Sequence, residues 1–494
     1  MIRAYDVAAV RAAEQSAMAG LPEGALMQRA AAGLATAVLR VLAGAGRPAY
    51  GARVVLLVGP GDNGGDALWA GARLAARGAR VDALLVADRA HEAGLGALRA
   101  AGGRVHPPGV NAVLAAAHVV VDGLLGIGGR PGLTGAAEAL VLALPPAVPV
   151  VAVDLPSGVD PDSGELAGTH IKAAVTVTFG AVKPALLLPP ASYAAGRVEL
   201  VDIGLDLPTP ILERLEPDDL AALWPIPGTD DDKYRRGVLR VIAGGTTYTG
   251  AAVLCTGAAV RAGAGMVRYV GPSPSADLVR ARWPEVVFGE GRVQAAVVGP
   301  GLEPDGDGSQ WAAAQSVLAT DLPCVVDAGA LALVSARWSA PTLLTPHAGE
   351  LARLLQARGE DVQRAEVEAA PLRYARRAAE LTGATVLLKG AATLVVSPHG
   401  SVRSQAGGPH WLATAGSGDV LAGIAGALLA AGLSPLDAGT LAVGVHGAAG
   451  QLASEGGPVS ASSVLEAVPA AIRRVLCRRA SAGCCAAARQ PAGC

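Results

Sequence analysis

Four polar clusters in the N-terminal part of the chain have the residue types of a catalytic or ligand-binding site. They are GDNGGD at 61–66, Asp122, GIGGRPG at 126–132 and DLPSG at 154–158. Asn63, Asp122 and Ser157 offer hard oxygen ligands without a thiol or an imidazole, which suits an alkali or hydrated cation better than zinc. Asp154 could act as a general base, and the glycine-rich turns could hold phosphate through their backbone N–H groups.

The stretch GPGDNGGDA at 59–67 also matches the dinucleotide-binding fingerprint G-x-G-x-x-G. The match alone is weak, because 65 of the 494 residues are glycine. The fingerprint also requires an acidic residue about 20 positions further on, at the end of the second strand. Asp82 has that spacing but lies inside a predicted strand, and Asp88 comes late. Asp62 and Asp66 would moreover repel a pyrophosphate at this turn, which argues against an ordinary NAD-dependent oxidoreductase.

The C-terminal part carries a second chemical pattern, AGSGDVLAG at 415–423. Small residues precede Asp419, which opens a long apolar helix. A glycine-rich turn at a helix N-terminus is an anion site, and an acid beside it could remove a proton from a hydroxyl group that attacks phosphorus. The structural alternative is a capped helix that packs closely through its small residues. A phosphate-binding P-loop sequence is not present.

Three other predicted strand ends in this part could meet a nucleotide or a flat ligand. Lys389 and Gly390 come just before Thr393, and His347 precedes a predicted helix. The third strand end is the glycine turn at 299–301. A single histidine is more often structural, but its place between a strand and a helix raises the expectation of a functional role.

Strands and helices alternate along the chain and must position these residues. Amphipathic helices are predicted at 6–19 and 25–43, and two further helices at 66–78 and 89–101. Continuous β-branched runs predict buried strands at 53–59, 80–88, 118–123, 148–154 and 174–180. This alternation predicts a doubly wound parallel sheet of the α/β class, which binds ligands at the carboxyl ends of its strands.

A second α/β series follows a segment rich in proline and aspartate. Its predicted strands lie at 238–245, 295–301, 323–329, 341–346, 384–390 and 392–398. The sequence therefore predicts two domains, 1–206 and 233–476, joined by a linker or crossing segment at 207–232. Residues 477–494 are predicted to form a disordered tail.

Composition restricts the class of protein further. The chain is 51% hydrophobic and 17% charged, and its formal net charge of -2 argues against nucleic acid or an anionic membrane as a partner. The N-terminus lacks the apolar core of a signal peptide, and the longest apolar runs are too short or too rich in proline to span a bilayer. None of the six cysteines forms a C-x-x-C pair, so a zinc site is not expected. We expect a soluble cytoplasmic protein.

The N-terminal motifs resemble those of NAD(P)H-hydrate epimerase domains, which have a Rossmann-like fold. The resemblance covers 1–206 and is carried by GPGDNGGDALWAGARLAARG, VVVDGLLGIGGRPGLTG and VPVVAVDLPSGVDPDSGE. Asp62 and Ala67 stand where the family has asparagine and glycine. The resemblance implies a potassium site at Asn63, Asp122 and Ser157, and a catalytic, substrate-binding Asp154. The other implied substrate contacts are Asp62, Asn63, Gly64, Gly65, Asp66, Gly126, Ile127, Gly128, Gly129, Arg130, Pro131 and Gly132.

The C-terminal motifs resemble those of the ADP-dependent NAD(P)H-hydrate dehydratases, a family of the ribokinase-like superfamily. They are KYRRG, GGTTYTGAA, VVGPGL, TPHAGE, LLKGAATLV and AGSGDVLAG, within 233–476. Ser417 stands where the family often has threonine. The resemblance implies magnesium with the phosphates of ADP, and Asp419 as a catalytic residue. The implied nucleotide contacts are Lys389, Gly390, Ala391, Ala392, Thr393 and Gly418, and the implied hydrate contacts are Ala252, Gly301, His347 and Asp419.

Together these patterns predict a bifunctional enzyme that repairs hydrated nicotinamide cofactors. It would interconvert the R and S hydrates of NAD(P)H and dehydrate the S form with ADP as co-substrate, giving AMP and phosphate. The resemblance to ribokinase-like proteins also implies a homo-oligomer. One alternative is a ribokinase-like kinase of a vitamin precursor, fused to a nucleotide-binding domain. Another is a nucleotide-sensing or scaffold protein without turnover.

Overall fold

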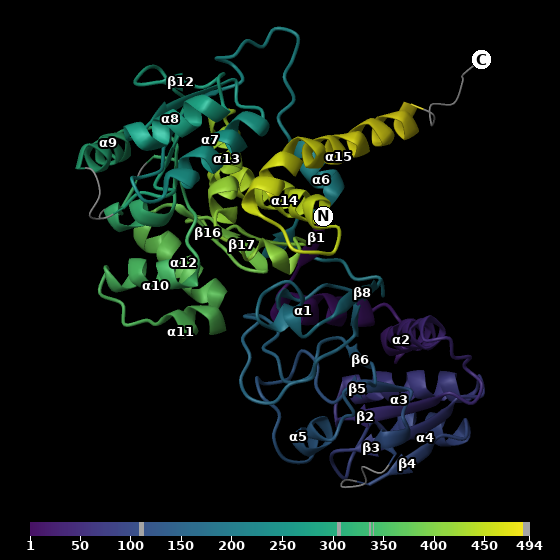
Figure 1. The fold of residues 1–494 in the computed structure, drawn as a ribbon. Coiled ribbons are helices and arrows are strands. Elements are labelled where there is room, and N and C mark those ends of the chain that lie inside the picture. Colours follow the sequence, from purple (N-terminus) through teal and green to yellow (C-terminus); the bar gives the residue numbers. More distant parts are fainter. Residues whose placement is uncertain (108–112, 304–307, 335–336, 339, 488–494) are drawn as a thin grey trace, which may run out of the picture. The chain divides into compact units, whose positions relative to one another are not determined.

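The computed structural model describes residues 1–107, 113–303, 308–334, 337–338 and 340–487, with side chains as far as Cys477. The chain divides into two compact units (Figure 1). One unit is Arg3–Leu212, called here the N-unit; the other, the C-unit, consists of Met1–Ile2 and Glu213–Cys494. Each unit contains its own sheet with helices packed on it, so the predicted α/β class is confirmed.

The N-unit is built on a seven-stranded sheet in the order β4-β3-β2-β5-β6-β7-β8, and all of its strand pairs are parallel. The chain starts in the middle of the sheet and works outward in both directions, as in a doubly wound fold. The strands are β2 (Arg53–Val58), β3 (Arg80–Leu85), β4 (Arg104–His106), β5 (Val119–Gly123), β6 (Val150–Val153), β7 (Val175–Phe179) and β8 (Arg197–Val201).

Helices cover this sheet and close its core. They are α1 (Val7–Met18), α2 (Ala25–Gly44), α3 (Asp62–Ala75), α4 (Glu92–Ala100) and α5 (Gly135–Leu142). Leu34 and Val38 of α2 and Leu68 of α3 are fully buried in one cluster with the strands. Helix α2 is long and apolar enough to cross a membrane by length and composition, but 44% of its most apolar window is buried inside the unit.

Helix α3 begins four residues before the predicted helix at 66–78, so DNGGD forms its first turn instead of a loop. The low helix propensity of glycine explains the late prediction. Close packing outweighs that propensity, because a Cβ atom at Gly64 would lie 2.1 Å from the Gly59 carbonyl oxygen. The early start moves Asp62 and Asn63 onto the helix N-terminus at the end of β2.

The second sheet has eleven strands in the order β1-β9-β18-β17-β16-β15-β14-β13-β10-β11-β12. All of them lie in the C-unit except Arg3 and Ala4 of β1 and Leu212 of β9. The pairs from β16 to β12 are parallel, whereas β17 pairs antiparallel with both β16 and β18. The strands are β1 (Ile2–Ala4), β9 (Leu212–Arg214), β10 (Val238–Ile242), β11 (Met266–Val270), β12 (Val287–Phe288), β13 (Ala295–Val298), β14 (Cys324–Val326), β15 (Thr342–Leu344), β16 (Thr385–Leu388), β17 (Ala392–Val396) and β18 (Val402–Ala406).

Helix α13 (Ser417–Ala430) lies at the centre of the C-unit core and packs on α7 (Thr249–Arg261), α14 (Pro435–Ser454) and the parallel strands. Gly423 permits this approach, because a Cβ atom there would lie 2.2 Å from the Cys255 carbonyl oxygen. The remaining helices are α6 (Pro217–Leu223), α8 (Ser273–Arg282), α9 (Gly308–Leu318), α10 (Ala348–Gln356), α11 (Arg364–Ala369), α12 (Pro371–Thr382) and α15 (Ala461–Ala487).

Two segments predicted to lack regular structure contain helix or strand. The predicted linker at 207–232 includes the unit boundary at 212–213, and also β9 and α6. Its Leu215, Leu220 and Trp224 are buried in the C-unit core, which explains why this stretch folds despite its prolines. Helix α15 continues through the first part of the predicted tail as far as Ala487, in keeping with the high helix propensity of alanine and arginine. The rest of the tail, 488–494, lies outside the described residues.

Candidate functional site

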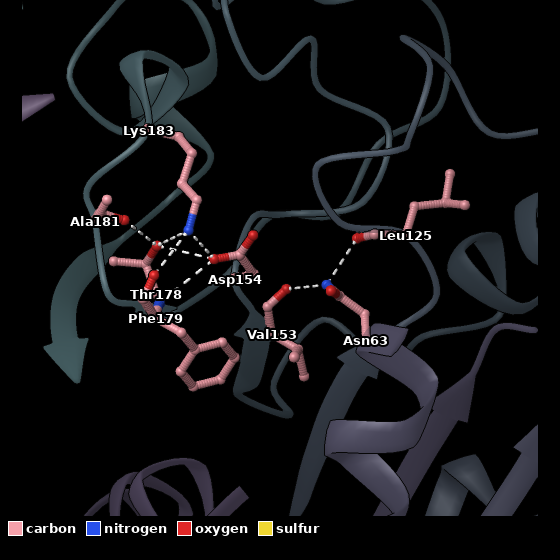
Figure 2. Close-up of polar contacts among 8 residues, drawn as sticks. All are labelled: Asn63, Leu125, Val153, Asp154, Thr178, Phe179, Ala181 and Lys183. Atoms are coloured by element: carbon pink, nitrogen blue, oxygen red, sulfur yellow. Dashed lines mark hydrogen bonds and ion pairs between the residues drawn. The ribbon is translucent and has the colours of Figure 1, made fainter. Parts of the chain in front are cut away.

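The structure brings the three predicted cation ligands of the N-unit into one hydrogen-bonded network. Ser157 donates to Asp122 twice, from Oγ to Oδ1 at 2.6 Å and from its backbone N–H to Oδ2 at 2.8 Å. Asn63 Nδ2 donates to the carbonyl oxygens of Leu125 (3.2 Å) and Val153 (2.6 Å), as Figure 2 shows. Leu125 closes the network, because its N–H donates to Ser157 Oγ at 2.9 Å.

Asp122 is fully buried, and its hydrogen-bond partners among the described residues are neutral. Burial raises the pKa of Asp122 to about 6, although the hydrogen bonds from Ser157 and Leu124 oppose the shift. A buried carboxylate is costly without a compensating charge. Its oxygens, Ser157 Oγ and the carbonyls around Asn63 form a set of hard oxygen donors, so the residues present fit an alkali cation such as potassium.

Asp154 follows β6 with a positive φ of 67°, which is uncommon for a residue other than glycine. Its Oδ1 accepts hydrogen bonds from Lys183 Nζ at 2.5 Å and Thr178 Oγ1 at 3.0 Å, while Lys183 Nζ also donates to the Phe179 carbonyl oxygen at 3.1 Å. In Figure 2 the second carboxylate oxygen of Asp154 points away from these partners. Lys183 is only 1% exposed, and sequence reasoning missed it because it is a single lysine in an apolar run.

Acidic side chains surround this ion pair. Asp66 on α3 is buried, and its Oδ1 has no hydrogen-bond partner within the described part of the chain. Burial raises the pKa of Asp66 well above its ordinary value, and the charges of Asp154, Asp62 and Glu14 add to the shift. Burial also raises the pKa of Glu14, a residue of α1 that sequence reasoning did not select. The cluster thus places a carboxyl group with a raised pKa, Asp66, near an aspartate that is paired with a lysine.

The predicted substrate loop, 126–132, follows β5 beside this network. Gly126 is needed there, because a Cβ atom would lie 2.2 Å from Asn63 Oδ1. Gly132 has a φ of 80°, and its N–H donates to the Gly158 carbonyl oxygen at 2.9 Å. The residues between them are half-buried or exposed: Ile127, Gly128, Gly129, Arg130 and Pro131. On α3, Gly64 and Gly65 are buried in the turn that carries Asp62 and Asn63.

In the C-unit, a cavity of about 870 Å³ lies at the N-terminus of α13. It is lined by all of the predicted nucleotide contacts except Ala392, which is buried in β17, and also by His347. The predicted contacts on its wall are Lys389, Gly390, Ala391, Thr393 and Gly418. Helix α6 contributes Pro217 and Leu220 to the wall, so the segment predicted as a linker forms part of the site.

Charged residues converge beside this cavity at the start of α13. Lys389 Nζ contacts Asp327 Oδ1 at 2.9 Å and Glu350 Oε2 at 3.7 Å. A Cβ atom at Gly418 would lie 3.5 Å from the same Nζ, which places the lysine at the anion turn. Burial, reinforced by Asp327 and opposed by Lys389, raises the pKa of Asp419 to about 7. Sequence reasoning missed Asp327, although an acid at the end of a buried strand is the signal that selected Asp122 and Asp154.

His347 caps α10 in the structure. Its Nδ1 accepts hydrogen bonds from the backbone N–H groups of Gly349 (3.1 Å) and Glu350 (3.3 Å). The backbone N–H of His347 donates to Glu350 Oε2 at 2.8 Å. A second histidine that sequence reasoning did not select, His446, lines the same cavity and lies 3.1 Å from Ser417 Oγ through its Nε2. Burial lowers the pKa of His446 to about 4, so this imidazole is neutral at pH 7.

The two remaining predicted hydrate contacts, Ala252 and Gly301, meet at another turn. A Cβ atom built at Gly244 would lie 2.8 Å from the Ala252 Cβ. A Cβ atom built at Gly301 would lie 3.1 Å from the Gly244 Cα. Ala252 and Gly301 therefore converge on Gly244, just after β10. Neither residue is part of the wall of the cavity described above.

Comparisons with known proteins match each unit separately. Residues 23–185 match the family described as "YjeF-related protein N-terminus", and residues 239–469 match the family described as "NAD(P)H-hydrate dehydratase". A solved structure of the ADP/ATP-dependent NAD(P)H-hydrate dehydratase from Bacillus subtilis, crystallised with ATP and Mg²⁺, is similar at a TM-score of 0.49. It is 26% identical, and the match covers 53% of this chain and 98% of that one.

Relatives that span both units are more informative. The bifunctional NAD(P)H-hydrate repair enzyme Nnr of Mycobacterium leprae is 48% identical over 92% of this chain and 95% of its own length. The enzyme of the same name from Mycobacterium tuberculosis strain CDC 1551 is 49% identical over 87% of this chain and 89% of its own. The predicted resemblance is thereby confirmed: this chain belongs to the family of bifunctional NAD(P)H-hydrate repair enzymes.

Proposed function

We propose that this protein restores hydrated NAD(P)H. The N-unit interconverts the R and S hydrates, and the C-unit dehydrates the S hydrate with ADP or ATP. The observation that carries this proposal is the pairing of two family matches with two separate polar clusters, one in each unit. The family membership also favours repair over the two alternatives, a vitamin-precursor kinase and a nucleotide sensor.

Epimerisation in the N-unit requires one group that donates a proton and one that accepts it. The hydroxyl group of the hydrate must leave one face of the ring, and water must return to the other. The raised pKa of Asp66 favours its protonated form, and its Oδ1 has no partner within the described part of the chain, so Asp66 is suited to donate the proton to the leaving hydroxyl. Asp154, held by Lys183 with its second oxygen free of that pair, is suited to accept the proton of the incoming water. Asp154 directly follows β6, and Asp66 lies in the first turns of α3, the helix that follows β2. Ligands of open α/β sheets bind at this edge.

Potassium is the cofactor that we propose for the N-unit, with Asn63, Asp122 and Ser157 as its site. The buried charge of Asp122 and the oxygen donors around it fit such an ion. The ion would supply a fixed positive charge beside the bound dinucleotide. The chain's own contribution is rigidity, because the same hydrogen-bonded network fixes the loop after β5 against the loop after β6.

Dehydration in the C-unit first replaces a poor leaving group with a good one. Asp419 accepts the proton of the substrate hydroxyl, whose oxygen forms a bond to the β-phosphorus of ADP while the bond to AMP breaks. The C–O bond then breaks, and its electron pair leaves with the phosphate. Loss of a ring proton restores the double bond of NAD(P)H. Lys389 and the N–H groups at the start of α13 would hold the transferring phosphoryl group. This role is supported by the position of Lys389 Nζ, 3.5 Å from a Cβ atom built at Gly418, in the wall of the cavity.

Magnesium is expected with the nucleotide phosphates. Asp327 and Glu350 share the ammonium of Lys389, and the described residues contain no group of three or more His, Cys, Asp or Glu side chains that could hold a metal ion. We therefore propose that Mg²⁺ enters with ADP instead of binding in a preformed carboxylate site. A magnesium-free assay with ADP should accordingly lose dehydration and keep epimerisation.

The direct test uses hydrated NADH with the protein, ADP, Mg²⁺ and K⁺, followed by the recovery of NADH absorbance. Recovery from both epimers supports the proposal, and failure with either epimer refutes it. Asp419→Ala should abolish recovery while epimerisation persists. Asp154→Ala should block recovery from the R hydrate and leave the dehydration of the S hydrate intact. The homo-oligomer and the cytoplasmic location expected from the sequence stay predictions; light scattering during gel filtration and fractionation of cells would test them.

A further inference from the structure

We propose that Asp327 is a positioning residue of the dehydratase site: together with Glu350 it holds the Lys389 ammonium at the N-terminus of α13, and it faces Asp419 with a second negative charge. This inference rests on the proposed function, because it assigns a task to Asp419. It deepens that function by naming a residue that controls the pKa of Asp419 and the position of Lys389 beside it.

The backbone fixes Asp327 more strictly than an ordinary turn residue. It follows β14 directly and is 2% exposed. Ala328, the next residue, has a φ of 47°, a left-handed conformation that is unfavourable for alanine. On the other side, a Cβ atom at Gly299 would lie 2.0 Å from the Asp327 carbonyl oxygen, so the turn after β13 packs against this backbone. Local strain and close packing both serve to aim the carboxylate.

Lys389 is fixed from three directions at the edge of the cavity. Its backbone N–H donates to the Pro346 carbonyl oxygen at 2.9 Å. Its ammonium lies 2.9 Å from Asp327 Oδ1 and 3.7 Å from Glu350 Oε2. Burial alone would lower the pKa of Lys389, but the charges of Asp327 and Glu350 outweigh burial and raise it. The two carboxylates thus keep a half-buried lysine charged beside the turn that would hold a phosphoryl group.

Other groups also face the start of α13, and their titration must be considered. They are Asp327 after β14, Lys389 after β16, Glu350 on α10, Cys255 on α7, His446 on α14 behind Ser417, and Arg474 of α15, which lines the same cavity. Burial raises the pKa of Cys255 well above its usual range and lowers that of His446 to about 4. Neither group changes charge near pH 7, where Asp419 does.

The sign of the effect follows from these charges. The Asp327 carboxylate disfavours the ionised form of Asp419 and forms an ion pair with the ammonium of Lys389. Asp327→Asn removes the repulsion and also frees Lys389 to approach Asp419. Both changes lower the pKa of Asp419. The acid limb of the dehydratase pH profile should therefore move to lower pH.

The experiment is a pH profile of kcat/KM for dehydration of the S hydrate by the full chain. Asp327→Asn should shift the acid limb down by about one pH unit. It should also lower the plateau kcat at least about tenfold, because Lys389 is no longer held in place. Asp327→Glu keeps the charge, so its limb should stay with the wild type even if its kcat falls. An unchanged limb in Asp327→Asn, or an equal shift in both variants, would overturn the proposal.

Three controls separate this result from damage to the fold. The epimerase activity of the same chain should persist in both variants, because it belongs to the N-unit. Asp277→Asn removes an exposed acid that pairs with Arg280 and should leave the profile unchanged. If Asp327→Asn does not fold, Glu350→Gln should shift the limb in the same direction by a smaller amount, and no shift there refutes the proposal. Absence of dehydration by the wild-type protein would instead refute the proposed function itself.

Discussion

Replacing Lys183 by methionine should destabilise the N-unit far more than removing any exposed cation. The Lys183 ammonium is buried and makes an ion pair with Asp154 at 2.5 Å, with further hydrogen bonds to Thr178 and Phe179. Methionine keeps most of the apolar contact but leaves Asp154 as a buried charge without a cation. Breaking a buried pair in this way costs about 3–5 kcal/mol. The matched control is Arg40→Met, because Arg40 pairs with Glu199 at a similar distance with its side chain 60% exposed, and such pairs contribute about 0.2–1 kcal/mol.

The two units must be measured separately, because a chain of two units need not unfold in one step. Hydrogen exchange read by mass spectrometry gives an opening free energy for peptides of each unit. Lys183→Met should lower the values for the strands β5 to β7 and leave those of the C-unit unchanged. The double variant Asp154→Asn with Lys183→Met should recover part of the loss, since no buried charge remains. A loss as small as that of Arg40→Met, or no recovery in the double variant, would refute the argument from charge.

Three further outcomes follow from the structure. The kcat/KM for dehydration should fall as the pH drops below about 7, because burial raises the pKa of Asp419 and the base must be ionised to accept a proton; a flat profile from pH 5 to 8 would contradict this role. Gly59→Ala should abolish epimerase activity and lower the melting temperature, whereas Gly61→Ala should do neither. The reason is that a Cβ atom at Gly59 would lie 1.9 Å from the Leu124 carbonyl oxygen, whereas one at Gly61 would meet no atom of the described residues within 4 Å. Asp122→Asn should remove the extra thermal stability that K⁺, compared with Na⁺, gives the protein; an equal K⁺ effect in this variant would argue against the site.

Sequence reasoning found the residues that come from strand ends, because the topology of a parallel sheet brings those ends to one edge. Asp122 lies at the end of β5, Asn63 follows β2 and Ser157 follows β6, and the structure joins the three in one network. The strands themselves were predictable from continuous β-branched runs, which two-sided burial requires. Asp419 was predictable for a similar reason, since a small-residue turn before an apolar helix is a local pattern.

Sequence reasoning could not find residues whose partners lie far along the chain. Lys183 becomes informative only when β6 and β7 pair and bring it to Asp154, 29 residues away. Glu14 approaches the same cluster from α1, a helix whose amphipathic pattern says nothing about its distant neighbours. Asp327 is different, because its position after a buried strand was a visible signal. It was missed because many aspartates follow strands as ordinary turn residues. Only its contact with Lys389 at 2.9 Å distinguishes Asp327 from them.

The fingerprint at 59–64 shows why a glycine pattern cannot by itself identify a bound cofactor. Gly59 and Gly64 are required here for packing, the first against the loop after β5 and the second against Gly59 itself. A hydride-transfer enzyme needs glycines at such a turn for the same close approach. The residues between the glycines distinguish the two cases. Asp62 opens α3 and Asp66 is buried in its first turns, so a pyrophosphate at this helix N-terminus would meet carboxyl groups. We therefore expect the hydroxylated ring of the dinucleotide, which can exchange protons with these acids, to lie here and its phosphates to bind elsewhere. Asp66→Asn should then lower the kcat of epimerisation much more than it raises KM, and the opposite pattern would indicate that this turn binds the phosphates.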